Sequence, residues 1–517
     1  MNPRAKKFLL LLLAAALLFG SGLMQKVLNR DRERLGLTRV NALDNAPPVL
    51  AFTTVALGGF RGLIANALWI RANDLQNDDK FFEAAQLATW ITDLEPSFTQ
   101  VWLFQAWNMA YNISVKFKDF PDRWRWVEHG IELLRDNGLR YNPNDVLIHR
   151  ELAWFFQHKM GQNLDDANAY YKQQWAAEMA PFFGPHGTNF SDLINPPNAQ
   201  ARTNALVLRD KYKMDAAFAQ KVDAQYGPFD WRLPEAQAIY WGAQGLQKAK
   251  EHPDKVKADD LITLRRIIYQ SMLQAFHHGR IIDDPFAKTS SLEPNLDLVA
   301  KVDDAYQTLM QEDEKNRDHI QKAHRNFLKD AVYFLYENNR VADAAKWYKM
   351  LGEKYPDNNI LDDPNSFPRT LTLDEYAVAR VQSELGDTSQ ERITGVIEGL
   401  IARSYYELAI GQDDRSVGFK LLARKVYDNY NKKIGKMQSN LERVGLPPFD
   451  VLNRNVLNKL LDSQEPVLPF AARAVLRTQL GMPAEPAAPP AGSAPTNAPP
   501  SSVTNIVENV TVAYAAK

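Results

Sequence analysis

The sequence predicts an all-α protein whose body is an α-solenoid, a stack of antiparallel helix pairs. From about residue 60 to 480, apolar residues recur at spacings of three and four, which is the period of one helix face. Strand-like alternation is scarce, and the helix formers Ala, Leu, Lys, Glu and Gln are abundant. Prolines that can stop one helix or open the next lie beside helical segments, at Pro96, Pro143, Pro181, Pro234 and Pro356.

Length and composition exclude several classes of protein. A chain of 517 residues is long enough for two to four domains or for one long repeat array. Lys and Arg number 61 against 62 Asp and Glu, giving a net charge of −1, which disfavours a nucleic-acid binder. The chain has no cysteine. Disulfides, iron–sulfur clusters, Cys-ligated zinc and thiol catalysis are therefore excluded.

The N-terminus has the pattern of a signal anchor. Arg4, Lys6 and Lys7 precede about 17 apolar or small residues from Phe8 to Met24. A helix of that length spans about 26 Å, at the short end of what crosses a bilayer core. We expect a retained, single-pass transmembrane helix over 1–25 in a bacterial inner membrane, with the bulk of the chain facing the periplasm. The alternatives are cleavage of the segment as a signal peptide and a buried helix of a soluble protein.

A second apolar stretch covers residues 48–70. It contains Arg61 near its middle, and a mid-membrane Arg costs at least about 2.5 kcal/mol. We therefore expect a buried or interfacial lead-in to the folded body. A second membrane crossing is the alternative.

The clearest helix–turn–helix unit runs from Arg325 to about Asn358. Asn338 and Asn339 form its expected turn, and Pro356 closes it. The expected core stripes are Leu328, Ala331, Val332 and Leu335 on the first helix and Ala344, Tyr348 and Leu351 on the second.

This unit resembles a tetratricopeptide repeat (TPR). Ala344, Tyr348 and Pro356 fall on the family's small, aromatic and proline positions, whereas Leu328 and Val332 stand where Trp and Gly are common. Ala84 and Pro96 repeat the twelve-residue spacing of Ala344 and Pro356, and Ala167 with Tyr171 repeats the small and aromatic pair. The resemblance extends over about 60–350 with gaps, and it implies a TPR-like solenoid with a concave groove.

These patterns divide the chain into seven parts. The Trp-rich repeats are followed by a loop rich in Gly, Pro and Asn, and 281–295 is expected to be a second loop. Seven prolines between Gly481 and Ser502 predict a disordered tail, whose last residues are either an unstructured end or a docking peptide. The expected parts are an anchor (1–25), a juxtamembrane segment (26–72), Trp-rich repeats (73–180), a loop (181–204), divergent repeats (205–358), a C-terminal helical region (359–480) and the tail (481–517).

No catalytic motif is found. The sequence lacks a phosphate-binding loop, a GxGxxG fingerprint, a GxSxG elbow and an HExxH motif. His277 and His278 are expected to interact with a helix C-terminus, and Asp pairs such as Asp165 and Asp166 are expected to cap helices. We therefore expect no enzyme activity, no cofactor and no metal.

The TPR frame selects candidate binding residues. Asn108 and Asn112 are four residues apart, so they lie on one face of a helix, and such amides clamp peptide backbones in TPR grooves. The candidate groove residues are Trp107, Asn108, Tyr111 and Asn112 in one repeat and Lys329, Tyr333, Tyr336 and Glu337 in another.

The expected function is a membrane-anchored scaffold that binds protein partners, and not nucleic acid, at the cell envelope. The alternative is an enzyme or glycan-binding subunit that uses the Trp-rich half, because seven of the 11 tryptophans lie between Trp90 and Trp175. That alternative predicts an aromatic-lined pocket with convergent carboxylates.

Overall fold

The computed structural model describes residues 60–484, except 254–255, 287–288, 362, 384–389, 436–445 and 464–465, and a few positions between 17 and 31. The predicted tail beyond residue 484 and most of the predicted anchor lie outside these residues. Among the described residues, no helix has both the length and the apolar character that a membrane span requires. The chain divides into two compact units, residues 1–148 and 149–517, and each is described by itself.

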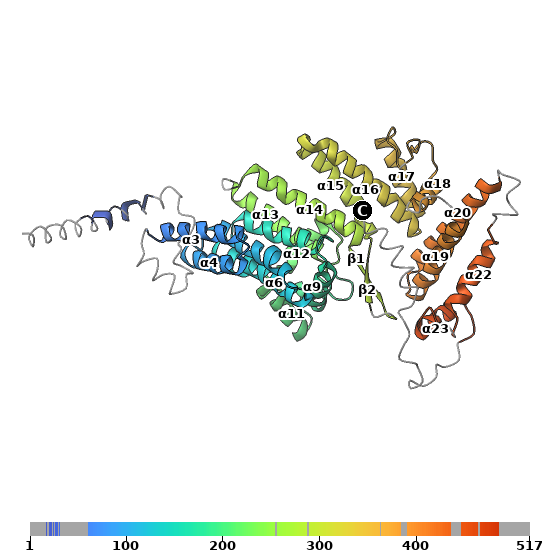
Figure 1. The fold of residues 1–517 in the computed structure, drawn as a ribbon, viewed down its shortest axis with the longest axis horizontal. Helices are drawn as coiled ribbons and strands as arrows, with labels where there is room; N and C mark the ends of the chain where they lie inside the picture. Colours follow the sequence, from blue (N-terminus) through green and yellow to red (C-terminus); the bar gives the residue numbers. More distant parts are fainter. Residues whose placement is uncertain are drawn as a thin grey trace, which may run out of the picture. The chain divides into compact units, whose positions relative to one another are not determined.

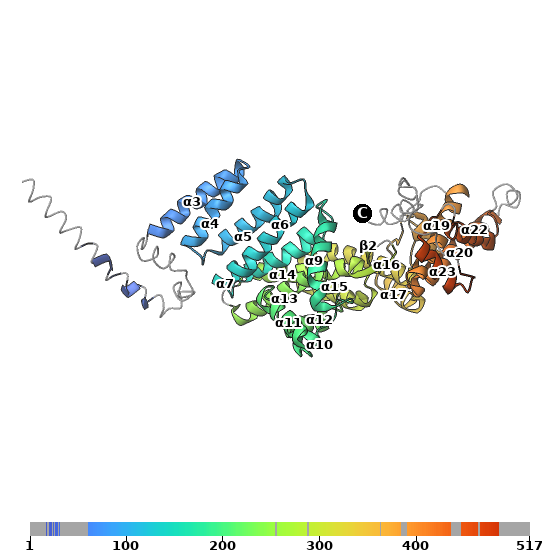
Figure 2. The same ribbon diagram turned by 90° about the horizontal axis from the view of Figure 1, so that it is seen from below.

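The first unit consists of helices that pack on their neighbours in chain order (Figure 2). Two of its helices end in a wider π-helical turn, η1 and η3, which is a rare feature in proteins. Its elements are α3 (Phe60–Asn77), α4 (Phe81–Leu94), α5 (Thr99–Trp107), η1 (Asn108–Ile113), η2 (Ser114–Lys116), α6 (Phe120–Glu132), η3 (Leu133–Gly138) and α7 (Leu139–Tyr141).

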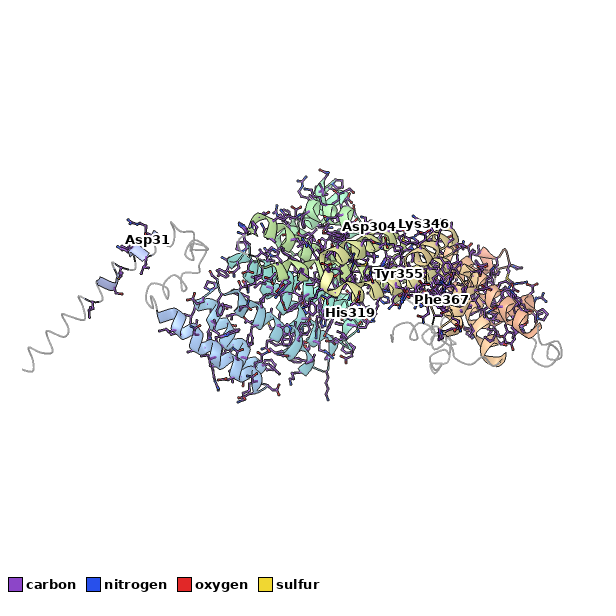
Figure 3. All side chains as sticks on the ribbon, turned by 90° about the horizontal axis from the view of Figure 1, so that it is seen from above. Asp31, Asp304, His319, Lys346, Tyr355 and Phe367 are labelled. Carbon is purple, nitrogen blue, oxygen red and sulfur yellow. The ribbon has the colours of Figure 1, made fainter. Side chains whose placement is uncertain are left out.

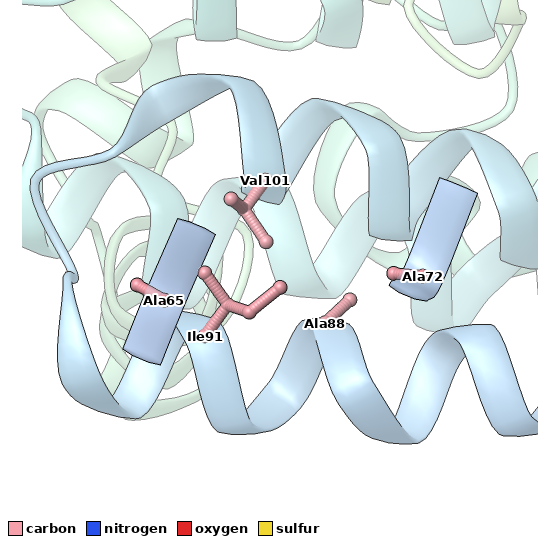
Figure 4. Packing of buried hydrophobic residues seen from close by; sticks show 5 residues of the cluster. All are labelled: Ala65, Ala72, Ala88, Ile91 and Val101. Atoms are coloured by element: carbon pink, nitrogen blue, oxygen red, sulfur yellow. The ribbon is translucent and has the colours of Figure 1, made fainter. Parts of the chain in front are cut away.

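Small side chains let the first helices approach closely. Ala65 and Ala72 of α3 meet Ala88 and Ile91 of α4, with Val101 of α5 beside them (Figure 4). All five are at most 2% exposed. Because alanine has no side chain beyond Cβ, it brings helix backbones together without leaving a void.

The second unit is also mainly helical. Helix α8 (Val146–Trp154) begins in the first unit and ends in the second. The further elements, in order, are η4 (Phe155–Met160), α9 (Asn168–Phe183), α10 (Ser191–Ile194), α11 (Ala199–Asp210), α12 (Ala216–Tyr226), α13 (Pro234–Glu251), α14 (Ala258–His278), β1 (Arg280–Asp284), β2 (Thr289–Glu293), η6 (Leu296–Leu298), α15 (Val299–Glu312), η7 (Glu314–Asn316), α16 (Arg317–Glu337), α17 (Val341–Lys354), α18 (Leu373–Ser383), α19 (Gln390–Ala409), α20 (Asp413–Gly435), α22 (Phe449–Leu460) and α23 (Phe470–Gln479).

The all-α class is thus confirmed for the described residues, and the clearest predicted helix pair is present. Helices α16 and α17 pack together (Figure 1), and the turn between them contains Asn339 with a φ of 59°. Leu328, Ala331, Ala344 and Leu351 are fully buried. The first helix begins at Arg317, two turns earlier than the repeat frame predicts.

The predicted loop over 281–295 is wrong. Strands β1 and β2 form an antiparallel hairpin there, with Ile281 opposite Leu292 and Asp283 opposite Ser290 (Figure 1). Asp283 and Asp284 end β1 and Pro285 follows in the turn, where the Asp284 Oδ1 accepts a hydrogen bond from the Phe286 amide at 2.8 Å. The β-branched pair Ile281 and Ile282 precedes that turn and favours the extended backbone.

The segment 181–204 is also more regular than a loop. Helix α9 continues through Pro181 to Phe183, and α10 and the start of α11 follow. Asn198 caps α11, because its Oδ1 accepts a hydrogen bond from the Ala201 amide at 2.9 Å. The proline lies in the last turn of α9, where it ends a helix instead of preventing one.

Candidate functional site

The two asparagines of the first candidate groove set bind each other. Asn108 is fully buried, and its Nδ2 donates to the Phe81 carbonyl oxygen at 2.9 Å. The Asn112 Nδ2 donates to the Asn108 Oδ1, also at 2.9 Å. The pair therefore ties η1 to the start of α4, and the Asn108 amide is engaged within the protein.

The aromatic residues of the same set lie nearer the surface. The rings of Trp107 and Tyr111 are stacked, with centroids 5.1 Å apart. Trp107 is 39% exposed, and Tyr111 is half-buried. A stacked pair of this kind offers a flat apolar contact area to a partner.

Helix α18 covers the second candidate set. Tyr333 and Tyr336 are buried. The Tyr336 hydroxyl donates to Asp374 Oδ1 at 2.6 Å, and the Tyr376 hydroxyl donates to the Lys329 carbonyl oxygen at 3.0 Å. This face of α16 is therefore occupied by a segment of the same chain, not open as a groove.

Glu337, the last residue of that set, belongs to a cluster of acidic and basic side chains. We define the carboxylate–guanidinium cluster as Glu293, Glu337, Glu407, Arg403 and Arg415. Arg415 Nη1 lies 2.7 Å from Glu293 Oε2, and Arg403 Nε lies 2.6 Å from Glu407 Oε1. Burial raises the pKa of Glu337 to about 7, although the two arginines oppose that rise. The cluster joins β2 and α16 to α19 and α20.

An aromatic patch on the first unit was not predicted. The ring of Trp126 on α6 contacts Phe82 of α4 edge-on at 5.7 Å, Phe117 at 6.2 Å and His129 at 5.9 Å between centroids. Phe82 is 51% exposed, Trp126 and Phe117 are half-buried, and His129 is exposed. We call these four residues the aromatic surface cluster. The adjacent Phe81–Phe82 pair was its sequence signal, since neighbouring helix positions point about 100° apart, so that one ring of such a pair is directed away from the centre of the buried face.

The second unit contains a polar interior. Lys172 and Glu235 are buried and attract each other. Burial lowers the pKa of the Lys172 ammonium and raises that of the Glu235 carboxyl. Lys172 Nζ donates to Asn163 Oδ1 at 2.9 Å. The Glu235 Oε2 and the side-chain amide of the buried Gln157 lack a hydrogen-bond partner within the described chain.

Such unmet polar atoms are costly, at about 1–3 kcal/mol each. Acidic and basic groups whose pKa values are shifted in opposite directions also occur at sites of proton transfer. The polar interior therefore combines buried polar atoms that lack a partner among the described residues with an acid and a base whose pKa values are shifted in opposite directions.

A second buried network joins α15, α16 and the end of α17. His324 Nε2 lies 2.6 Å from Asp303 Oδ1, and Nδ1 lies 2.8 Å from the Tyr355 hydroxyl. Catalytic triads use the same order of groups, in which a carboxylate orients an imidazole and the imidazole activates a hydroxyl. However, His324 is fully buried, so the network holds helices together. His319, one turn earlier, is exposed, and Figure 3 shows where His319 and Tyr355 lie.

Comparison with protein-family models, curated proteins and solved structures finds no match for this chain.

Proposed function

We propose that the protein is a TPR-like helical-repeat scaffold that binds a protein partner through its first unit. The aromatic surface cluster carries this proposal. It combines a half-exposed Phe82 with Trp126, which is braced by the rings of Phe117 and His129. Large aromatic side chains in well-packed surroundings supply much of the energy at recognition surfaces.

The scaffold supports binding because it holds the rings in place. Phe82 stands on α4, which shares an alanine-rich core with α3 and α5, and Trp126 stands on α6, which packs on α5 and η1. Little side-chain entropy remains to be lost when a partner docks on rings that are already fixed. The stacked pair of Trp107 and Tyr111 is a second aromatic contact in the same unit.

We also propose that this scaffold works at the cell envelope. Arg4, Lys6 and Lys7 before the apolar run Phe8–Met24 support an anchor with the N-terminus inside and the body outside the cytoplasm. The near-zero net charge supports a protein partner over nucleic acid.

The test is crosslinking of the tagged full chain in a bacterial envelope, followed by identification of the partner and measurement of its affinity. Phe82→Ala with Trp126→Ala should weaken binding at least about tenfold, because hot-spot residues cost about 2 kcal/mol or more each. Trp90→Ala is the matched control, since Trp90 is 49% exposed on the same helix but outside the cluster. Equal loss in both variants, with folding intact, would refute the assignment of the surface.

The second candidate function is an enzyme or a glycan-binding subunit, and the polar interior favours it. Lys172 and Glu235 carry oppositely shifted pKa values, and the buried Trp175 has an indole N–H without a partner within the described chain. Thermal-shift screening with oligosaccharides tests it. A shift that disappears in Lys172→Met would support this function over the scaffold.

A further inference from the structure

We infer that the outward face of α3 lies on the surface of an anionic lipid bilayer, next to the anchor proposed above, on which this inference rests. Leu63 and Ile70 are 65% and 64% exposed, and Ile64 and Ala67 are exposed beside them. Positions 63, 67 and 70 follow the spacing of one helix face. The side chains therefore form a single apolar stripe.

The other side of α3 belongs to the core. Ala65, Ala72 and Leu75 are buried, and α3 packs there on α4 (Figure 4). Helix α3 is the first helix that the structure describes in this unit, and a helix face that meets water in a stacked array is normally polar. α3 instead presents leucine and isoleucine, which indicates that another apolar phase covers this side.

Charge indicates which phase that is. In the sequence of α3, Arg61 precedes and Arg71 follows the residues of the stripe, and the first acidic residue is Asp74. The first 73 residues hold ten basic and three acidic residues, a net charge of +7, whereas the remaining 444 carry −8. Anionic headgroups attract basic residues by about 1 kcal/mol each near the surface. A second copy docked on the same stripe would instead bring basic faces together.

Sequence position makes the contact favourable. Phe60 follows Met24, the end of the predicted anchor, by 36 positions, so the bilayer is at high effective concentration for α3. Residues 45–60 carry no charge. Because the opposite face of α3 packs on α4, its stripe lies in the plane of the interface, where apolar side chains reach about 5–10 Å into the headgroup boundary.

The test uses the full chain, which has no native cysteine. Single spin labels are attached to Leu63→Cys, Ile70→Cys and the control Leu164→Cys, which is 70% exposed in the second unit. The protein is reconstituted in vesicles of phosphatidylethanolamine and phosphatidylglycerol. Relative to the control, the labels at 63 and 70 should collide at least about twofold more with lipid-dissolved oxygen than with an aqueous nickel complex.

Each other outcome overturns the inference. Water-like accessibility at 63 and 70 means that the stripe faces solvent. Protection from both reagents with dipolar broadening indicates a second copy, and protection without broadening indicates a protein partner or another segment of this chain. Co-sedimentation is scored separately: failure to sediment with vesicles refutes the anchor, whereas sedimentation with water-like labels refutes only the α3 contact.

Discussion

At the scale of single residues, the structure places ionisable groups where their charge depends on burial. Glu337 ends α16 beside Glu293, Glu407, Arg403 and Arg415, and burial raises its pKa to about 7. Its folded-state pKa therefore exceeds its unfolded value. The native state holds an extra proton between those two pKa values, so stability is present at low pH and is lost as the pH rises through about 7.

Glu337→Gln should remove this dependence. Between pH 5 and 8 the wild type should lose on the order of 2 kcal/mol more unfolding free energy than the variant, because the variant has no proton to release. Urea unfolding at several pH values measures the difference. Glu353→Gln on the exposed face of α17 is the control, and equal pH slopes in wild type and Glu337→Gln would contradict the prediction.

Glycine at position 418 is required by a close approach of helices. A Cβ at this position would overlap the Glu337 carbonyl oxygen and lie 2.9 Å from the Asn339 nitrogen. Gly418→Ala should destabilise the second unit by about 1–3 kcal/mol or more through overpacking. Gly399→Ala is the matched control, since a Cβ there meets no atom within 4 Å, and it should stabilise α19 by about 0.5–1 kcal/mol. Thermal melts that show the two variants moving together would count against this packing.

At the scale of elements, the hairpin is attached to the C-terminal helices by charge. The carboxylate of Glu293 on β2 forms ion pairs with Arg415 Nη1 at 2.7 Å and with Arg403 Nη2 at 3.3 Å. Tyr406 of α19 also donates to Asp284 of β1. A two-stranded sheet is marginally stable alone, so we attribute its persistence to this attachment.

Replacing one partner of the buried pairs should therefore be costly. Arg415→Met removes the closer arginine partner of Glu293 and leaves Arg403 to neutralise both Glu293 and Glu407. The variant should destabilise the protein by about 3–5 kcal/mol. Arg424→Met removes a pair with Asp428 in which both side chains are about half exposed, and should cost less than about 1 kcal/mol. The denaturant midpoints of the two variants measure these losses of stability. Similar midpoints would exclude a structural role for the cluster.

At the scale of the whole molecule, helices are held mainly by neighbours within each unit. In the second unit, α14 packs against α13, α15, η4, η6 and β2, whereas the main helix partner of α23 is α19. Stability in such arrays is close to a sum of local and nearest-neighbour terms. The free energy of local unfolding should therefore differ from helix to helix along the chain.

Amide hydrogen exchange should reveal this gradient. Amides of α14 should open at a free energy about 2 kcal/mol higher than those of α23, because more apolar neighbours must separate. Mass spectrometry of exchanging peptides from the full chain measures both helices in one sample. Equal protection would indicate a single cooperative transition instead.

The sequence determined the helical class and the clearest pair of helices. The spacing of Leu328, Ala331 and Leu335 defined a buried face, and Ala344 with Leu351 defined its partner, because helix periodicity is a local property. The hairpin was missed because its strands are five residues each, and because Asp283, Asp284 and Pro285 at the end of β1 are typical of a loop sequence.

Only the tertiary structure decided which faces are covered. Tyr333 and Tyr336 look like groove residues in sequence, yet α18, some 40 residues later, packs over them. Asn108 and Asn112 share one helix face, but the side-chain amide of Asn108 is already bonded within the protein. Its Nδ2 donates to the Phe81 carbonyl oxygen, and its Oδ1 accepts from Asn112. Exposure of Phe82, Leu63 and Ile70 depends equally on which helices pack nearby. A repeat pattern fixes which residues share a face, whereas distant segments of the chain determine whether that face meets protein or solvent.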